Sequence, residues 1–165
     1  MQAAKGYRAP MDSPILLCTD GSELSIAALA AGLQLLDPGA AKVVVTVMDT
    51  PDMSLLTGTG FAGGVVTPEE YDESVALAAT DAQNIADEVR VALGLADVPT
   101  EVLTGEPGSV ICQYAEEVNA KGIVLGSRGR GGIRRAMLGS VSDHVVRNAP
   151  CPVVVTGHDG IVDEG

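Results

Sequence analysis

The sequence predicts an α/β protein with a single doubly wound domain. Its five-stranded parallel sheet should have the order 3-2-1-4-5, with helices on both faces. Strand-like and helical segments alternate along the chain, as they do in α/β folds. The strand-like runs are continuous stretches of Val, Ile and Leu, as expected for parallel strands covered on both faces. Parallel strands require right-handed crossovers, which favours this flavodoxin-like or Rossmann-like arrangement.

The composition supports a packed domain and disfavours some partners. The chain has 165 residues, enough for one buried core, and 46% of them are hydrophobic. Only 2% are aromatic, so the core must consist of Val, Leu, Ile and Ala. The formal net charge of −12 disfavours binding to nucleic acid or to an anionic membrane through the general surface.

The two ends of the chain differ from the middle. Residues 1–12 and 157–165 are small, polar and weakly patterned, so we expect mobile tails around a domain at 13–156. The sequence shows neither a signal-type N-terminus nor an apolar run of membrane-spanning length, which predicts a cytoplasmic protein. The cysteines lack C-x-x-C spacing, so we expect three free thiols, at Cys18, Cys112 and Cys151.

The first half of the chain contains two strands and two helices. An apolar run predicts a strand at 14–18, and Ser22 can cap a helix that runs to about residue 36. A second, β-branched strand is predicted at 42–48. Residues 50–67 are glycine-rich and form a predicted long loop. Thr67 is then the expected N-cap of an amphipathic helix that ends near residue 93.

The second half repeats the alternation. A weaker third strand is predicted at 98–103, followed by a turn at 105–108 and a short helix at 109–119. The fourth strand is predicted at 121–125. A helix at 141–147 and a fifth strand at 152–156 complete the fold.

The most informative segment is the glycine-rich stretch from Gly126 to Ser140, which lies between the fourth strand and the last helix. Glycines allow the backbone to approach an anion closely, and the N–H groups at a helix start favour negative charge. We therefore expect phosphate binding here, although a flexible connection is the alternative. The stretch also holds four of the seven arginines of an acidic chain: Arg128, Arg130, Arg134 and Arg135.

A second candidate segment follows the first strand. In a 3-2-1-4-5 sheet, ligands bind where the strand order reverses, outside the carboxyl ends of strands one and four. Thr19, Asp20 and Gly21 follow strand one, and Gly126 begins the segment after strand four. The alternative is a plain strand-to-helix turn with a serine cap. The two segments together predict a nucleotide site with a carboxylate on one side and phosphate donors on the other.

These residues resemble the ATP-binding members of the universal stress protein family, whose signature is G-x-x-G, nine residues, then G-[ST]. This chain has Gly126 and Gly129, nine residues at 130–138, then Gly139 and Ser140. The resemblance extends over nearly all of residues 13–156. It is carried by four further segments, at 19–22, 46–49, 105–109 and 145–153.

The resemblance implies roles for individual residues. Asp20 would lie near the ribose and phosphates, close to a phosphate-bound Mg²⁺, and Val47 would meet adenine through its backbone. Gly126 and Gly129 would line the ribose and phosphate path, and the start of the last helix would donate to the phosphates. Arg128 could reach a phosphate or be solvated. The implied nucleotide-binding set is Thr19, Asp20, Val47, Gly126, Arg128, Gly129, Gly139, Ser140 and Val141.

The resemblance implies a stress-response or signalling module that holds ATP, AMP or cyclic AMP and passes its state to protein partners. It also implies a homodimer, for which the edge strand at 152–156 is the expected interface. A slow ATP hydrolase and a nucleotide-free scaffold are the alternatives. We favour binding over catalysis, because the chain has no P-loop motif and neither His144 nor His158 completes a catalytic set.

Overall fold

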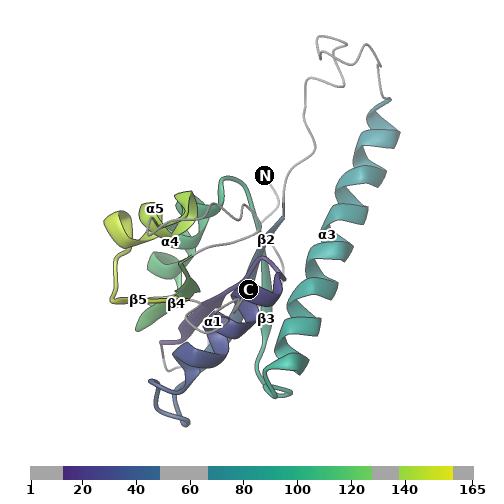
Figure 1. Ribbon diagram of the computed structural model, residues 1–165. Coiled ribbons are helices and arrows are strands. Elements are labelled where there is room, and N and C mark those ends of the chain that lie inside the picture. The colour runs from purple at the N-terminus through teal and green to yellow at the C-terminus, as the bar shows by residue number, and fades with distance from the viewer. Residues whose placement is uncertain (1–12, 49–66, 128–137, 158–165) are drawn as a thin grey trace, which may run out of the picture.

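The computed structural model describes residues 13–48, 67–127 and 138–157, and these form an α/β domain (Figure 1). The predicted loop at 50–67 and the predicted tails lie outside the described residues, apart from Thr67 and Gly157. The elements are β1 (Ile15–Cys18), α1 (Glu23–Leu33), β2 (Lys42–Met48), α3 (Pro68–Ala92), β3 (Thr100–Thr104), α4 (Pro107–Glu117), β4 (Gly122–Gly126), α5 (Ser140–Asn148) and β5 (Val153–Thr156).

The described strands form one parallel sheet of order β3-β2-β1-β4-β5, which confirms the predicted topology. The central strand β1 pairs with β2 and β4, and Leu17 lies opposite both Val44 and Val124. This register aligns the carboxyl ends of β1 and β4 at the same edge of the sheet. The edge strands are β3 and β5, whose residues are only half-buried or exposed.

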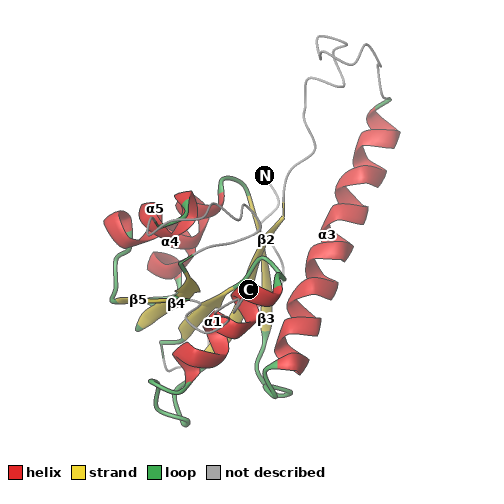
Figure 2. Cartoon of the chain, in the orientation of Figure 1, coloured by secondary structure: helices red, strands yellow, loops and turns green. Residues whose placement is uncertain are grey.

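Helices cover both faces of the sheet, and the strands bury their side chains on both (Figure 2). Leu17 points to the face covered by α1 and α3, whereas its neighbour Leu16 points to the face covered by α4 and α5. This two-residue alternation explains why the strands are apolar throughout. The core on the α1 and α3 face consists of Leu17, Leu29, Val44, Ala86, Val89 and Val124.

The helix starts follow local sequence signals. Ser22 caps α1, and its hydroxyl accepts the Ser25 N–H at 3.1 Å. Thr67 and Glu70 form a reciprocal capping box at α3, in which each side chain accepts the other residue's N–H, at 3.2 and 2.8 Å. Both caps were predicted from the sequence, although the glutamate's reciprocal bond was not.

Several helix boundaries differ from the predictions, and two of the differences have a clear local cause. Helix α1 ends at Leu33 rather than near residue 36, because residues 34–36 continue as tight turns that bond back three residues. Helix α4 begins at Pro107 rather than Ser109. The carboxylate of Glu106 accepts the N–H groups of Gly108 and Ser109 at 3.2 and 2.8 Å, and thus acts as an acidic N-cap.

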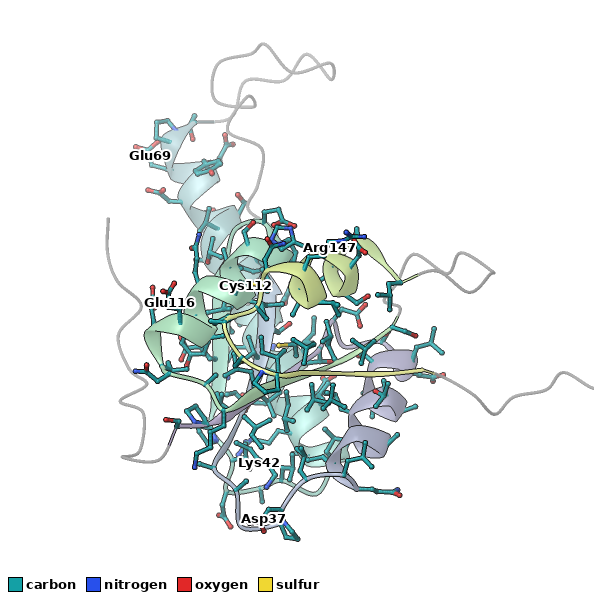
Figure 3. The ribbon with its side chains drawn as sticks, turned by 90° about the vertical axis from the view of Figure 1, so that its left-hand side faces the viewer. Asp37, Lys42, Glu69, Cys112, Glu116 and Arg147 are labelled. Carbon is teal, nitrogen blue, oxygen red and sulfur yellow. The ribbon has the colours of Figure 1, made fainter. Side chains whose placement is uncertain are left out.

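The connection from α1 to β2 is closed by a lysine. The ammonium group of Lys42 donates to the carbonyls of Asp37, Pro38 and Ala40 at 3.1, 3.0 and 2.8 Å. Figure 3 shows Asp37 and Lys42 together at the lower end of the molecule. Among the described helices, none has the length and apolar character that crossing a membrane requires.

Candidate functional site

The first part of the candidate site is the turn that joins β1 to α1. Thr19 continues β1, since its N–H donates to the Val45 carbonyl at 2.9 Å. The carbonyl of Thr19 in turn accepts the hydroxyl of Thr46 at 3.1 Å. The side chain of Thr19 is buried, and its hydroxyl bonds Ser25 at 2.8 Å and accepts the Gly21 N–H at 3.0 Å. The end of β1 is therefore fixed to both β2 and α1.

Asp20 is half-buried at the sheet edge, and its carboxylate organises the turn. One oxygen, Oδ1, accepts the N–H of Ser22 at 3.0 Å and the hydroxyl of Ser22 at 2.6 Å. Both bonds stabilise the ionised carboxylate, and they point Asp20 in a defined direction. The carboxylate is an acceptor held in place at the predicted position.

At Val47, strand β2 still pairs with β3 on one side but extends beyond its pairing with β1 on the other. Strand β1 pairs with β2 as far as Cys18 opposite Val45, whereas β2 continues to Met48. Val45 directs its carbonyl toward β1, so the two-residue alternation of a strand turns the backbone groups of Val47 to the same side. These groups extend past the last paired residue of β1, where an adenine edge could meet them.

The second part of the candidate site is the junction between β4 and α5. Strand β4 ends at Gly126, and the next residue, Ser127, donates its N–H to the Thr156 carbonyl at 2.9 Å. The carbonyl of Ser127 accepts the N–H of Gly139 at 2.8 Å and the hydroxyl of Ser142 at 3.1 Å. The two ends of the glycine-rich segment therefore lie in contact.

Helix α5 begins directly at this junction. Gly139 is its N-cap, with extended backbone angles (φ −64°, ψ 162°), and has no side chain that could cap the helix. Its carbonyl accepts the Asp143 N–H at 2.9 Å, which closes the first turn. The N–H groups of Ser140, Val141 and Ser142 thus form an uncapped helix start, where the backbone and the helix dipole favour an anion.

The two parts lie at the same edge of the sheet, where β1 and β4 end side by side. Leu17 lies opposite Val124, so extending the register by two residues places Thr19 opposite Gly126. The chain leaves β1 for α1 on one face of the sheet, and leaves β4 for α5 on the other face (Figure 1). This reversal is the switch point at which doubly wound sheets bind ligands.

The predicted site residues are thus brought together as far as they are described. Arg128 and Gly129 lie outside the described residues, as do the arginines at 130, 134 and 135. The structure adds Ser142, which the sequence analysis missed. Ser142 is buried, and its hydroxyl lies 3.1 Å from the carbonyls of both Ser127 and Gly139. A serine in the first turn of a helix after a glycine cap is the only sequence signal for it.

Of the other reactive side chains, His144 and the three cysteines are packed against neighbours or at least partly buried. His144 packs on Gly108 at the start of α4, and hydrogen bonds from Ser109 hold the pKa of the neighbouring Glu106 below its usual range, with a smaller effect of His144. Burial raises the pKa of all three thiols, Cys18 most strongly, so none is an activated nucleophile. Within the described ranges, no group of His, Cys, Asp and Glu side chains could hold a metal ion.

Together these features define a doubly wound α/β domain in which the Asp20 turn and the uncapped start of α5 lie at the switch point of the sheet. A sequence model of the universal stress protein family matches residues 11–157 of this chain. The chain belongs to the universal stress protein family, as its sequence signature predicted.

Two curated relatives support this assignment. A universal stress protein of Methanocaldococcus jannaschii is 32% identical over 142 residues, which cover 86% of this chain and 79% of the relative. A universal stress protein of Bacillus subtilis is 30% identical over 148 residues, which cover 88% of this chain and 99% of the relative.

Solved structures show the same fold. The universal stress protein UspA of Lactobacillus plantarum superposes with a TM-score of 0.67 at 23% identity, over 90% of this chain and 99% of its own. A universal stress protein in complex with cAMP gives a TM-score of 0.54 at 22% identity, over 88% and 97% of the two chains. A family member from Arabidopsis thaliana with AMP bound gives 0.54 at 17% identity, over 88% and 91%.

Proposed function

We propose that this protein binds an adenine nucleotide, ATP in the first place, and acts as a stress-response or signalling module. The observation that carries the proposal is the junction of β4 and α5. The Ser127–Gly139 bond places an uncapped helix start at the carboxyl edge of the sheet, opposite the Asp20 turn. An uncapped helix start beside a glycine-rich segment is suited to phosphate oxygens.

The phosphates would lie against the first turn of α5. Ser140 is exposed and Val141 half-buried, so their N–H groups and the Ser140 hydroxyl are accessible from the crevice. Gly126 and Gly139 present bare backbone on either side. Arg128 and Gly129, from the segment between them, complete the proposed phosphate contacts. Backbone N–H donors do not distinguish one phosphate group from three. AMP and cyclic AMP are therefore the alternatives to ATP.

The base would lie at the other end of the crevice, along the end of β2. Backbone N–H and C=O groups of Val47 can pair with the adenine edge without any help from a side chain. The ribose would then cross the ends of β1 and β4, between Thr19 and Gly126. This order of base, ribose and phosphate follows the edge of the sheet from β2 to α5.

Mg²⁺ is the proposed companion of a triphosphate. Among the described residues no cluster of three or more metal-binding side chains is present, so the Asp20 carboxylate suits a cation held mainly by phosphate oxygens and water. The N–H and the hydroxyl of Ser22 hold the Asp20 carboxylate in place through Oδ1, and carboxylate oxygens are ligands that Mg²⁺ prefers. The bound cation would supply charge neutralisation between Asp20 and the phosphates.

We further propose that β5 pairs two copies of the chain into a homodimer. The carbonyls of Pro152 and Thr156 accept N–H groups of Ile123 and Ser127, so this alternate set faces β4. The backbone groups of Val153 and Val155, between them, are directed to the open edge. A short apolar edge strand of this kind favours pairing with its own copy across a two-fold axis.

The proposal is tested on the purified chain in two steps. The bound small molecules are released by denaturation and identified by mass spectrometry. ATP, AMP and cyclic AMP are then titrated by calorimetry, with and without Mg²⁺. We expect ATP binding that strengthens with Mg²⁺. If no adenine ligand gives a heat of binding and no nucleotide is recovered from the purified protein, nucleotide binding is refuted and a protein-interaction scaffold is favoured.

Slow hydrolysis is measured in parallel as phosphate release. The carboxylate of Asp20 is held by Ser22 rather than poised as a base, so we expect binding without significant turnover. Turnover that survives purification and disappears in Asp20→Asn would establish a hydrolase instead.

A further inference from the structure

The turn after β1 is covered by a residue from a distant helix. Gly21 has a left-handed backbone (φ +79°), and a Cβ built on it would lie 2.6 Å from Cγ2 of Ile85 on α3. The other nearby atoms of Ile85, Cβ and Cγ1, would lie 3.6 Å away. One methyl branch of Ile85 therefore fills the space that a side chain at Gly21 would need.

The turn is held from two sides. On one side are its own hydrogen bonds, in which the N–H groups of Gly21 and Ser22 donate to Thr19 Oγ1 and Asp20 Oδ1, both at 3.0 Å. On the other side is the Ile85 methyl group. Because a glycine has unusually wide backbone freedom, hydrogen bonds alone leave this turn easier to deform than a turn of other residues. The methyl group removes the space into which Gly21 could move.

Ile85 is itself presented by a well-anchored helix. Ala82, Ala86 and Val89 are buried on the same stretch of α3, and small alanines let the helix approach the sheet closely. The side chain of Gln83 also donates to the Thr100 hydroxyl of β3 at 2.7 Å. This stretch of α3 is fixed to the sheet, so the Ile85 side chain is held in contact with the turn and limits its movement.

We propose that Ile85 is a positioning residue for the nucleotide site. It holds the Gly21 backbone so that Asp20 is aimed into the crevice, and it thereby couples the position of α3 to the geometry of the site. The coupling to the ligand rests on the proposed function, whereas the control of the turn does not. Ile85 touches no reacting group and acts only through the turn.

The test uses the branching of the side chain. Ile85→Val keeps the Cγ2 methyl group that contacts Gly21 and removes only the Cδ1 carbon. Ile85→Leu keeps the number of carbons, but lacks the second γ branch. A leucine there either vacates the Cγ2 position or drives its two δ-methyl groups against Gly21. Leucine is also the better helix former, so a loss in this variant does not arise from weakening α3. Ile111→Leu, in the core on the opposite face of the sheet, is the matched control.

Two readouts separate the proposals. Amide hydrogen exchange at Gly21 and Ser22 reports the turn without any ligand, and calorimetry reports affinity for ATP with Mg²⁺. We expect faster exchange at both amides and about tenfold weaker ATP binding in Ile85→Leu, the loss typical of one well-placed hydrogen bond. Ile85→Val and Ile111→Leu should match the wild type in both.

Unchanged exchange in Ile85→Leu, or equal losses in Ile85→Val and Ile85→Leu, would overturn the role of Ile85. If the wild type binds no adenine nucleotide, the proposed function fails, and the exchange rates alone then decide whether Ile85 controls the turn. If exchange changes but ATP affinity does not, the coupling to the site is refuted.

Discussion

The carbonyl of Ser127 accepts the N–H of Gly139 at 2.8 Å, and this bond joins the end of β4 to the cap of α5. The glycine-rich segment between them begins and ends at one point. The helix start is therefore held at the sheet edge whatever path the intervening residues take. The bond also brings the two ends of the signature to one place, as the proposed phosphate site requires.

Ser142 reinforces this junction, so Ser142→Ala should loosen it. The variant loses a buried hydroxyl within 3.1 Å of two carbonyls, and we expect a loss of about 1 kcal/mol in the free energy of unfolding. Nucleotide affinity should fall as well, because the start of α5 is less firmly held. Denaturant unfolding and calorimetry measure the two effects. Ser74→Ala, at an exposed serine of α3, is the control, and an unfolding midpoint no lower than that of this control would refute the role of Ser142.

Gly108 on α4 and His144 on α5 are in contact, so substitutions at the two positions should have non-additive effects on the free energy of unfolding. A Cβ on Gly108 would lie 2.7 to 2.9 Å from three atoms of the His144 side chain, so Gly108→Ala should destabilise the fold by about 1–3 kcal/mol through overpacking. In a His144→Ala background the two ring atoms are absent and only the contact with the Cβ of residue 144, at 2.8 Å, remains. Gly108→Ala should therefore destabilise the fold less in that background than in the wild type, and alanine is also the better helix residue. A double-mutant cycle from thermal unfolding tests this, and additive effects would contradict the packing.

The open edge of β5 predicts the behaviour of Val155→Pro. Proline removes an N–H that is directed away from β4, so the sheet itself loses no bond, while pairing with a second copy is blocked. We expect a dimer for the wild type and a monomer for the variant in sedimentation experiments at micromolar concentration. Circular dichroism should show the same secondary structure in both. A wild type that sediments as a monomer would refute the proposed interface.

The thiols should react slowly in the native state. Burial raises the pKa of Cys18, Cys112 and Cys151, so fewer thiolates exist at pH 8 than in the unfolded chain. Each raised pKa means that the folded state holds its proton more tightly. The associated stability is full below the ordinary thiol pKa and is lost as the pH rises above it. Alkylation rates and unfolding midpoints from pH 7 to 10 test this, and native rates equal to those in denaturant would contradict it.

Most of the fold could be predicted because its signals are local. The β-branched runs, the serine and threonine caps of α1 and α3, and the alternation of elements each depend on neighbouring residues, and the strand order follows from general rules for parallel sheets. The N-cap of α4 was missed because glutamate is an uncommon cap. It acts here through hydrogen bonds to Gly108 and Ser109 that no periodicity shows.

The sequence indicated the parts of the candidate site that consist of glycine and backbone groups, but it did not indicate the residues that tertiary packing brings to the site. Gly126, Gly139 and Ser140 are visible in the signature. Ile85 lies on a helix with an ordinary amphipathic pattern, and only the folded chain places it against Gly21. In the sequence Ser142 looks like any surface serine, so its hydrogen bond to the Ser127 carbonyl could not be predicted.

The central claim is that the N–H groups at the start of α5 bind phosphate, and Ser140→Pro tests it most directly. Proline suits the first position of a helix, and the backbone of Gly139 (φ −64°, ψ 162°) suits a following proline, so the fold should be kept. The variant removes both the hydroxyl and the N–H of Ser140, whereas Ser140→Ala removes the hydroxyl alone.

We predict that calorimetric titration with ATP and Mg²⁺ shows a loss of roughly 10- to 100-fold in affinity for Ser140→Pro, the value of a hydrogen bond to a charged group. The loss for Ser140→Ala should be smaller, with both variants folded as the wild type. Wild-type affinity in the folded Ser140→Pro protein would contradict the account.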